Sequence, residues 1–551
     1  MPGASMAERD GTAAAMLLAL VGAALLAAVL LLPDRPAPPA LALPLELPAL
    51  VLLLLAAPLA LRGALAWGIA LALGLLALLK LADVAAQTAY LRPFNPVLDL
   101  GLVRSAWELG RGSLGTPLAL AAVAAAGLAV AALVVLLCWG AGRIARLAPR
   151  RKGGVAAAAL AAVVLVALAA RPGTGTLGVP ANADTTRLAW EHAVAATAAR
   201  ADLAAFRAEA ERDPWAAAPA SAILPGLAGV DVLVVFVESY GRSALENPRY
   251  APTVTAALND GEAALAGAGL AARSGWLTAP MVGGQSWLAH ASVLSGLWID
   301  GEGRYRALLA SPRLSLNALA RRAGWRTAAV MPAITRAWPE AAWFGYDAVL
   351  AAGDLGYRGK PFNWVTMPDQ FTLEALRRAL LPPGPRTPAF VETALISSHA
   401  PWTPIPPVLP WDALGDGTVF DRYATAGDPP EVVWRDRDRV REQYRRSLDY
   451  VLRVVPEFAA RLAPRPTLLV VLGDHQPAAF VSEDSVSRDV PLALIGPPAL
   501  LAKLDDWKFT PGLVPAADAP VWRMDAFRGR FLAAFGGREP FGADAHRTGG
   551  L

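Results

Sequence analysis

Cysteine is nearly absent from this sequence of 551 residues: the chain has a single one, Cys138, which lies inside an apolar segment. The rest of the chain therefore has no pair of cysteines for a disulfide, and an ordinary hydrophobic core must hold it. The same absence excludes a thiolate metal site and a cysteine nucleophile, because both require a free cysteine side chain.

A strong excess of charge of one sign is also missing, since the formal net charge is only +4. Five basic residues of one short loop would account for that excess: Arg143, Arg146, Arg150, Arg151 and Lys152. No stripe of basic residues interleaved with aromatic side chains occurs elsewhere in the sequence. This composition argues against nucleic acid as a partner.

Long apolar runs are missing after residue 171, whereas they crowd the sequence before it. A helix needs roughly 20 apolar residues to cross about 30 Å of hydrocarbon. We therefore expect residues 1–171 to form a transmembrane domain of five helices, a five-helix bundle. The five expected spans are 12–32, 41–61, 63–82, 116–142 and 153–170.

The basic loop between the fourth and fifth spans predicts the orientation of this domain. Short loops rich in Lys and Arg mark the cytoplasmic side, and Arg62 between the second and third spans agrees. With five spans, the N-terminus is then cytoplasmic and everything after residue 171 is extracytoplasmic. The first span is preceded by Arg9, which Glu8 and Asp10 offset, so we interpret it as an uncleaved anchor and not as a signal peptide.

The sequence after residue 171 predicts a linker, a catalytic domain and a tail. Residues 172–229 form the juxtamembrane linker, with a Pro/Gly breaker stretch at 172–176 and an amphipathic helix over 185–212. Residues 537–551 form a polar C-terminal tail.

Between them, over 230–536, apolar runs alternate with helical patterns, which predicts an α/β domain with a mostly parallel sheet and helices on both faces. The expected strands are 231–237, 327–331, 389–396, 467–472 and 490–495. The expected helices are 253–267, 286–296, 314–323, 371–380, 439–462 and 522–535.

Two of the expected strands end in residues that bind metals. The run 467–473 ends in Asp474 and His475, and the run 231–237 ends in Glu238. In open α/β sheets, ligands bind in the crevice beyond the carboxyl ends of the strands. These residues therefore suggest a metal site at the rim of the sheet, although a helix cap or a satisfied polar residue is the alternative for each.

A glycine-rich turn, Gly283-Gly284-Gln285, places Ser286 at the start of an expected helix. The free N–H groups and the dipole of a helix N-terminus favour negative charge there. Ser286 is thus either a helix cap or a nucleophile. The two ligand-bearing strand ends favour the nucleophile.

These motifs together resemble a known family. In chain order they are Glu238 after a strand, Ser286 in a Gly-x-Ser turn, His399 in Ser397-Ser398-His399-Ala400-Pro401, and Gly473-Asp474-His475. The set resembles the lipoteichoic acid synthase and phosphoglycerol transferase branch of the alkaline phosphatase/sulfatase superfamily. The resemblance covers the whole chain, because that branch also has five spans followed by one extracytoplasmic domain.

The resemblance implies roles for individual residues. Glu238, Asp474 and His475 would bind one divalent ion, with Ser286 as the fourth ligand and the nucleophile. The ion would be manganese or magnesium rather than zinc. His399 would contact the substrate phosphate or protonate the leaving group, and Arg336 would bind the phosphoglycerol group.

Two further residues near the serine are expected to face the substrate. Trp287 follows Ser286 directly, and His290 lies one helical turn beyond it. For His290 a buried core histidine is the alternative interpretation, and for Arg336 it is a surface ion pair.

Several departures from related patterns limit what the resemblance implies. The lipoteichoic acid enzymes use a threonine nucleophile, and the tryptophan that stands two positions before their arginine is Ile334 here. Ser286 is followed by Trp287-Leu288-Ala289-His290 and not by the motif that sulfatases need for formylglycine. The cysteine-rich phosphoethanolamine transferases also fit poorly, because no cysteine lies outside the membrane domain.

The sequence thus predicts a membrane phosphotransferase of the cell envelope. It would move a phosphoglycerol-type head group from a membrane phospholipid to an extracytoplasmic glycan or polymer, through a phosphoryl-serine intermediate. A sulfatase-like hydrolase of phosphate or sulfate esters is the alternative, and a non-catalytic membrane scaffold is a third. The Ala-, Arg- and Pro-rich composition favours a bacterial source, and the five expected spans then predict the bacterial cell (inner) membrane as the location.

Overall fold

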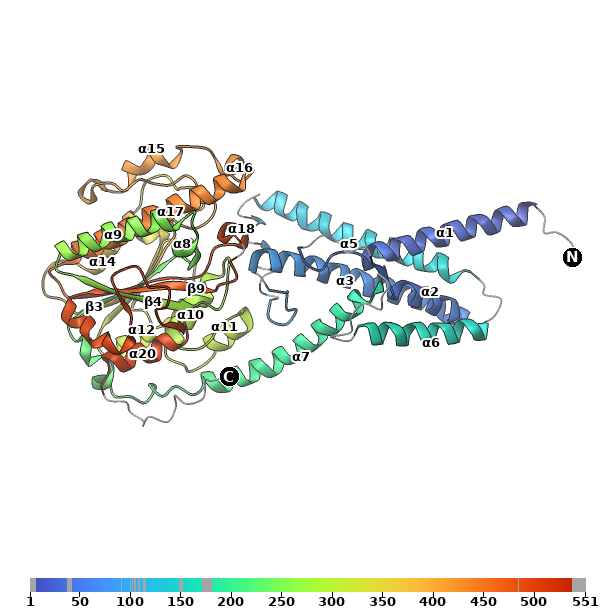
Figure 1. Ribbon diagram of the computed structural model, residues 1–551, viewed down its shortest axis with the longest axis horizontal. Coiled ribbons are helices and arrows are strands. Elements are labelled where there is room, and N and C mark those ends of the chain that lie inside the picture. Colours follow the sequence, from blue (N-terminus) through green and yellow to red (C-terminus); the bar gives the residue numbers. More distant parts are fainter. Residues whose placement is uncertain are drawn as a thin grey trace. The chain divides into compact units, whose positions relative to one another are not determined.

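The computed structural model describes residues 6–36, 42–90, 92–99, 115–147, 152–170, 181–483 and 485–537, with scattered positions between 101 and 111. It divides into two compact units, Met1–Asp202 and Leu203–Leu551, which Figure 1 shows in sequence colours. The boundary lies within helix α7 (Asp184–Ala210), inside the expected linker. The predicted breaker at 172–176, the basic residues Arg150 and Arg151, and the tail from 538 to 551 lie outside the described residues.

The first unit contains apolar helices at each of the five expected places. They are α1 (Met6–Leu30), α2 (Glu46–Ala56), α3 (Arg62–Tyr90), α5 (Thr116–Ala145) and α6 (Lys152–Ala169). Within the described residues, three segments are long and apolar enough to cross a membrane: Ala13–Leu30, Leu59–Thr88 and Thr116–Ala145. The other two apolar helices, Glu46–Ala56 and Gly154–Ala169, are shorter.

The second and third spans differ from the expectation in where they begin and end. Helix α2 ends at Ala56, and Ala57 is extended (φ −61°, ψ 143°) because it precedes Pro58, which disfavours helical geometry in the residue before it. Leu59–Leu61 then form a 3-10 turn that leads directly into α3. Helix α3 begins at Arg62 and continues to Tyr90 instead of ending at residue 82.

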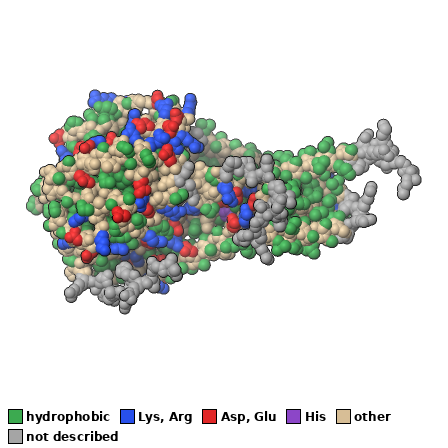
Figure 2. Space-filling model, viewed as in Figure 1, with side chains coloured by type: hydrophobic (Ala, Val, Ile, Leu, Met, Phe, Trp, Pro, Cys, Tyr) green, Lys and Arg blue, Asp and Glu red, His purple; other side chains and the backbone are tan. Residues whose placement is uncertain are grey.

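Apolar side chains cover much of the outside of the first unit, as the green surface over these helices in Figure 2 shows. Leu71, Leu75 and Leu128 are among the large apolar side chains that are exposed. A contiguous apolar surface of this kind marks a membrane or protein interaction site. At the same time α1 and α5 pack closely, since a Cβ on Gly22 would meet the backbone of Gly140.

The second unit is built on a nine-stranded sheet among the described residues, with the order β10-β4-β9-β8-β3-β7-β5-β6, and β11 pairs with β4. The strands are β3 (Asp231–Val237), β4 (Ala271–Thr278), β5 (Arg326–Met331), β6 (Ala348–Ala351), β7 (Ala389–Leu395), β8 (Thr467–Gly473), β9 (Asp489–Gly496), β10 (Thr510–Pro511) and β11 (Val521–Arg523). The run from β8 to β6 is parallel, while β9 is antiparallel to both β8 and β4. The predicted mostly parallel sheet is confirmed.

Helices cover both faces of this sheet, as expected. They are α8 (Ser243–Glu246), α9 (Ala251–Gly267), α10 (Ser286–Ser295), α11 (Glu302–Leu309), α12 (Leu316–Arg322), α13 (Ala341–Phe344), α14 (Asp369–Leu380), α15 (Asp421–Ala424), α16 (Pro430–Val433), α17 (Arg437–Leu462), α18 (Ala479–Ser482), α19 (Pro498–Leu501) and α20 (Ala526–Phe535). Strand β3 is buried at every position, and its side chains alternate between two cores. Leu233 and Val235 belong to the core with α9, α14 and α17, whereas Val232 and Val234 belong to the core with α10, α12 and α20.

The expected strands were those with continuous apolar runs, and the sequence reading missed the others. Strand β4 was missed because Arg273, Ser274 and Gly275 interrupt its apolar residues, and β6 was missed because it is only four residues long. The expected helix 522–535 was partly wrong, since Val521–Arg523 pair with β4 and the helix begins at Ala526.

The register of the central strands positions the site. Val237 of β3 pairs with Leu395 of β7 on one side and with Gly473 of β8 on the other. The three strands therefore end at the same level, and the residues that follow them leave the sheet at one edge.

Candidate active site

The edge beyond β3 and β8 brings Glu238, Asp474 and His475 together. Each offers one ligand atom, and these atoms lie within 4.8 Å of one another. His475 Nε2 lies 3.3 Å from Glu238 Oε1 and 3.8 Å from Asp474 Oδ2. All three side chains are buried, with Asp474 and His475 each 1% exposed.

Neighbouring groups fix the orientation of these three side chains. Asp474 Oδ1 accepts hydrogen bonds from the backbone N–H of Ser239 (2.8 Å) and of His475 (2.7 Å), which leaves Oδ2 for the cluster. His475 Nδ1 lies 2.8 Å from the carbonyl oxygen of Gln476, so Nδ1–H donates there and Nε2 points at the carboxylates. The Ser239 hydroxyl donates to Glu238 Oε1 at 2.9 Å. Contacts of this kind orient metal ligands in known sites.

Ser286 joins the cluster from helix α10. The three residues before it have positive φ angles, 75° at Gly283, 146° at Gly284 and 65° at Gln285, and glycine adopts such angles without steric cost. This sharp turn makes Ser286 the first residue of the helix. Its Oγ donates to Glu238 Oε2 at 3.0 Å and lies 3.2 Å from His475 Nε2.

Charge interactions inside the cluster shift the pKa values of all three groups. Burial would lower the pKa of His475, but the Asp474 and Glu238 carboxylates outweigh it and raise that pKa to about 9. Burial and the nearby Glu238 charge raise the pKa of Asp474 to about 6. For Glu238, burial would raise the pKa, and the His475 and His399 charges hold it well below its usual range.

The donor set fits a divalent cation. Two carboxylates, one imidazole nitrogen and one hydroxyl are the oxygen and nitrogen ligands that such ions take. Buried carboxylates this close repel one another unless a positive charge compensates them, so the arrangement favours a cation at the centre. The predicted cluster of Glu238, Asp474 and His475 is thus present, while the identity of the metal stays a prediction.

A cavity of about 500 Å³ opens beside this cluster. Its wall includes Trp287, His290 and His399, three of the residues expected to face a substrate. His399 is exposed, and its Nδ1 lies 2.5 Å from the carbonyl oxygen of Ala400. Other aromatic side chains complete the wall: Trp338, Phe344, Trp402, Trp434 and Phe480.

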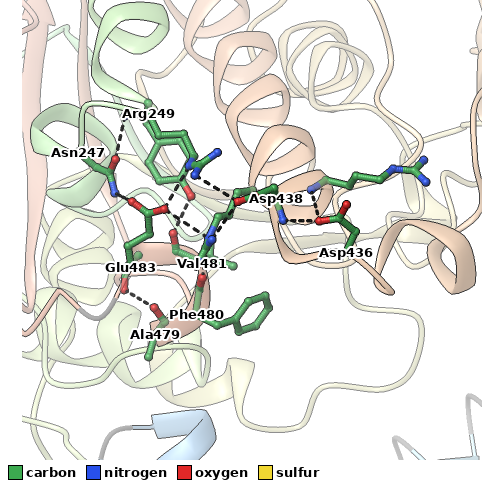
Figure 3. A network of polar contacts seen from close by, with 12 residues as sticks. Asn247, Arg249, Asp436, Asp438, Ala479, Phe480, Val481 and Glu483 are labelled. Carbon is green, nitrogen blue, oxygen red and sulfur yellow. Dashed lines mark hydrogen bonds and ion pairs between the residues drawn. The ribbon is translucent and has the colours of Figure 1, made fainter.

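Polar contacts hold the segment that carries Phe480, and Figure 3 shows them from close by. Arg441 of α17 donates from Nε to the carbonyl oxygen of Phe480 at 3.0 Å. Glu483, just after α18, accepts from Asn247 Nδ2 at 2.8 Å and from Arg249 Nε at 3.2 Å. The segment is therefore anchored at Phe480 and at Glu483, which holds this part of the cavity wall.

Arg336 was expected to bind the phosphoglycerol group. Its side chain is exposed, and it is not among the residues that line the cavity. In this structure the cavity wall contains no lysine or arginine among the described residues. A role for Arg336 in binding the phosphoglycerol group stays a prediction.

One residue of the cavity escaped the sequence reading altogether. Glu392 of β7 is 1% exposed, lines the cavity, and accepts a hydrogen bond from His290 Nδ1 at 2.8 Å. The signal for it was available, since Glu392 is the only charged residue in the otherwise apolar strand Ala389–Leu395. A buried charge inside a strand requires partners.

Comparisons with known proteins agree with this geometry. The family model described as Sulfatase matches residues 231–502, which span β3 to α19 and include the cluster. This match confirms the sulfatase part of the predicted resemblance, while the lipoteichoic acid synthase and phosphoglycerol transferase branch stays a prediction. No curated protein sequence matches the chain.

Three solved structures are similar at low identity. The lipoteichoic acid synthase LtaP from Listeria monocytogenes is 12% identical, with 58% of this chain and 74% of that chain covered and a TM-score of 0.34. The Streptococcus pyogenes phosphoglycerol transferase GacH, in complex with sn-glycerol-1-phosphate, is 13% identical, with 61% and 80% covered and a TM-score of 0.37. The periplasmic domain of EptC from Escherichia coli, in complex with Zn, is 14% identical, with 56% and 83% covered and a TM-score of 0.37. At these values they do not bear on the donor, the acceptor or the metal of this chain.

Proposed function

We propose that this chain, whose residues 231–502 form a sulfatase domain of the alkaline phosphatase superfamily, is a membrane-anchored, metal-dependent phosphotransferase. It would move a phosphoglycerol-type head group from a phospholipid to an extracytoplasmic glycan or polymer. The observation that carries the proposal is the position of Ser286 Oγ, 3.0 Å from Glu238 Oε2 and 3.2 Å from His475 Nε2. A serine hydroxyl at the centre of a metal-type ligand cluster, open to a cavity, is placed to act as a nucleophile.

Glu238, Asp474, His475 and Ser286 would hold one divalent ion, Mn²⁺ or Mg²⁺ rather than Zn²⁺. When bound, the ion supplies positive charge that lowers the pKa of the serine hydroxyl and neutralises phosphoryl oxygens. The cavity wall offers no lysine or arginine among its described residues, so this charge is the main one available to a phosphodiester.

The first half-reaction transfers the head group to the enzyme. Ser286 gives its hydroxyl proton to Glu238, and the Ser286 oxygen attacks the phosphorus atom. The new Oγ–P bond forms as the bond from phosphorus to the diacylglycerol oxygen breaks. His399, which is exposed on the cavity wall, donates a proton to that departing oxygen.

The second half-reaction releases the head group. The hydroxyl of a glycan or polymer attacks the phosphoryl-serine and its proton passes to His399. The bond from phosphorus to the Ser286 oxygen breaks, and that oxygen takes back the proton from Glu238. If water replaces that hydroxyl, the same site acts as a phosphoester hydrolase. The two outcomes differ only in the acceptor.

The first unit would hold this site next to its lipid donor. We propose five spans (12–32, 41–61, 63–82, 116–142 and 153–170), a cytoplasmic N-terminus and an extracytoplasmic catalytic domain over 230–536. The three helices of spanning length and the exposed apolar side chains support a membrane anchor. A bacterial inner membrane is the proposed location.

The experiment is a lipid-cleavage assay on the purified full chain in detergent or liposomes. With Mn²⁺ and a fluorescent phosphatidylglycerol, we expect release of diacylglycerol by the wild type and none by Ser286→Ala. Glycans added to the reaction separate transfer from hydrolysis, since transfer adds glycerol phosphate to the glycan and hydrolysis yields free glycerol phosphate. Equal behaviour of wild type and Ser286→Ala across lipids and metals would show that the chain is a scaffold.

A further inference from the structure

The cavity beside Ser286 has a polar group that the mechanism above does not use, the pair formed by His290 and Glu392. His290 belongs to α10, and its ring stacks on Phe236 with centroids 3.7 Å apart and an interplanar angle of 11°. Its Nδ1 lies 2.8 Å from Glu392 Oε1. Both side chains are buried and both line the cavity.

Glu392 fixes the tautomer of this histidine. The carboxylate also accepts from Asn317 Nδ2 at 3.3 Å and from the hydroxyl of Tyr346. Burial and the Glu392 charge raise the pKa of Tyr346 well above its usual value, so its hydroxyl stays a donor. Because Glu392 accepts from all three neighbours, His290 carries its hydrogen on Nδ1.

The other ring nitrogen of His290 faces the cavity. Nε2 has no hydrogen-bond partner among the described residues, and it is not fully buried. It therefore keeps accessible surface, and the cavity is what lies beside it. Trp338 and Phe344 line the same cavity as aromatic walls.

The position of His290 relates it to the reacting centre. It follows Ser286 by four residues on α10, and side chains at this spacing lie on one face of a helix, about 6 Å apart at Cβ. A phosphoryl group on Ser286 would carry its remaining substituent within reach of Nε2. An imidazole nitrogen without hydrogen accepts hydrogen bonds, and the Glu392 charge behind it favours donors over anions.

We infer that His290 and Glu392 form the floor of a head-group site. This site selects a phosphoryl group whose remaining substituent, the one that stays on phosphorus after Ser286 attacks, ends in a hydrogen-bond donor. The donor is a hydroxyl or an ammonium group, since both offer hydrogen to Nε2. The inference rests on the proposed function for the reaction, but the binding of the head group can be measured without turnover.

The test compares four soluble phosphate monoesters by calorimetry on the full chain in detergent with Mn²⁺. Glycerol phosphate and ethanolamine phosphate carry donors, whereas propyl phosphate and choline phosphate have none on the alkyl part. We expect the wild type to bind at least one of the first pair about tenfold more tightly than both of the second, the value of one well-placed hydrogen bond. Which of the two donor esters binds more tightly distinguishes a hydroxyl from an ammonium source.

Two variants assign this preference to the pair. His290→Phe keeps the ring that stacks on Phe236 and removes Nε2, so the preference should vanish while propyl phosphate binds as before. The matched control is His192→Phe, because His192 also pairs with a buried carboxylate, Asp83, at 2.8 Å but does not line the cavity. The control should keep the wild-type preference.

Nitrogen NMR of imidazole-labelled protein gives an independent readout. The chain has only five histidines, and His290→Phe identifies the signal of His290. We expect the Nδ1–H tautomer in the wild type and a mixture in Glu392→Gln. The comparison of the wild type with Glu392→Gln remains informative even if His290→Phe is too unstable for its affinity for the phosphate esters to be measured.

Two results would overturn the inference: equal affinity of the wild type for glycerol, ethanolamine and propyl phosphates, or a preference that survives in His290→Phe. Failure of the proposed function looks different. In that case no lipid is cleaved, although the wild type still binds the phosphate esters with a hydrogen-bond donor more tightly than those without one.

Discussion

The backbone N–H of Ser239 donates a hydrogen bond to Asp474 Oδ1 at 2.8 Å, although the two residues are 235 positions apart in the sequence. This bond joins the ends of β3 and β8, whose register places Val237 opposite Gly473. It leaves Asp474 Oδ2 for the cluster with Glu238 and His475. The site therefore depends on the pairing of the two strands as much as on the ligands themselves.

Replacement of Ser286 tests its role as a nucleophile. Ser286→Ala removes the hydroxyl, so kcat for diacylglycerol release should fall by a factor of about 10³ or more. Ser286→Thr keeps a hydroxyl and should retain measurable turnover. Trapping of labelled head group on the wild-type chain, absent in Ser286→Ala, is the direct measurement. A labelled adduct on Ser286→Ala would contradict the assignment.

Loss of a ligand should remove the metal. Asp474→Asn and His475→Ala should each reduce the bound Mn²⁺, measured by elemental analysis after gel filtration, to a small fraction of the wild-type content. Metal at 100 times its Kd stabilises a folded protein by about 2.7 kcal/mol, so the rise in Tm on addition of Mn²⁺ should also disappear. Asp449→Asn, which alters a partly exposed carboxylate on α17, is the control and should bind metal normally.

Metal affinity should depend on pH because protons compete for the cluster. His475 has a pKa of about 9 and Asp474 of about 6 without metal, so binding must displace a proton from His475 at neutral pH. The Kd for Mn²⁺ should therefore weaken by up to about tenfold for each pH unit below 9, and more steeply below pH 6. Titrations between pH 6 and 8.5 give this slope, and a flat profile would contradict the assignment of His475.

The same protonation affects the stability of the metal-free chain. The folded pKa of His475 is raised, so the charged imidazole stabilises the fold fully below its unfolded pKa of about 6.5, and this contribution is lost as the pH rises toward 9. Denaturant unfolding of metal-free wild type should show this loss. In His475→Gln the loss should be absent, whereas addition of Mn²⁺ should reverse it in the wild type.

Asp369 should produce a pH dependence of its own. Burial raises its pKa to about 7, even though it accepts backbone hydrogen bonds from Ile396 (2.7 Å) and Ser397 (3.1 Å). A raised carboxyl pKa means that the folded state binds more protons, so stability should fall as the pH rises from about 4 to 7. The free energy of unfolding of Asp369→Asn should show a smaller fall over this window. An identical slope in both proteins would show that Asp369 is ionised throughout.

The close approach at the end of β8 requires glycine at position 473. A Cβ there would meet the carbonyl oxygen of Tyr240, which is backbone and cannot rotate away. Gly473→Ala should therefore destabilise the chain by about 2 kcal/mol or more and also weaken metal binding at Asp474. Gly353→Ala is the matched control, because nothing lies within 4 Å of its added Cβ and its effect should be small.

Elements with a local signal in the sequence could be predicted without the structure. Strands β3 and β8 are buried on both faces, so each appears in the sequence as a continuous apolar run that predicts a strand. Glu238 and Asp474 directly follow these two runs, so their positions at the strand ends could also be predicted. Ser286 was identifiable because two glycines precede the start of a helix. The apolar segments of the first unit were identifiable by composition alone, but not their ends, because Pro58 divided one span and extended another.

Contacts between side chains from distant segments could not be predicted in this way. Glu392 is separated from His290 by 102 positions and lies in a strand that the sequence presents as apolar core, so the pair became visible only when α10 packed over β7. Arg336, whose role the resemblance implied, is not among the residues that line the cavity. Periodicity records which face of an element is buried, but contacts between elements depend on strand order and register, which local sequence does not encode.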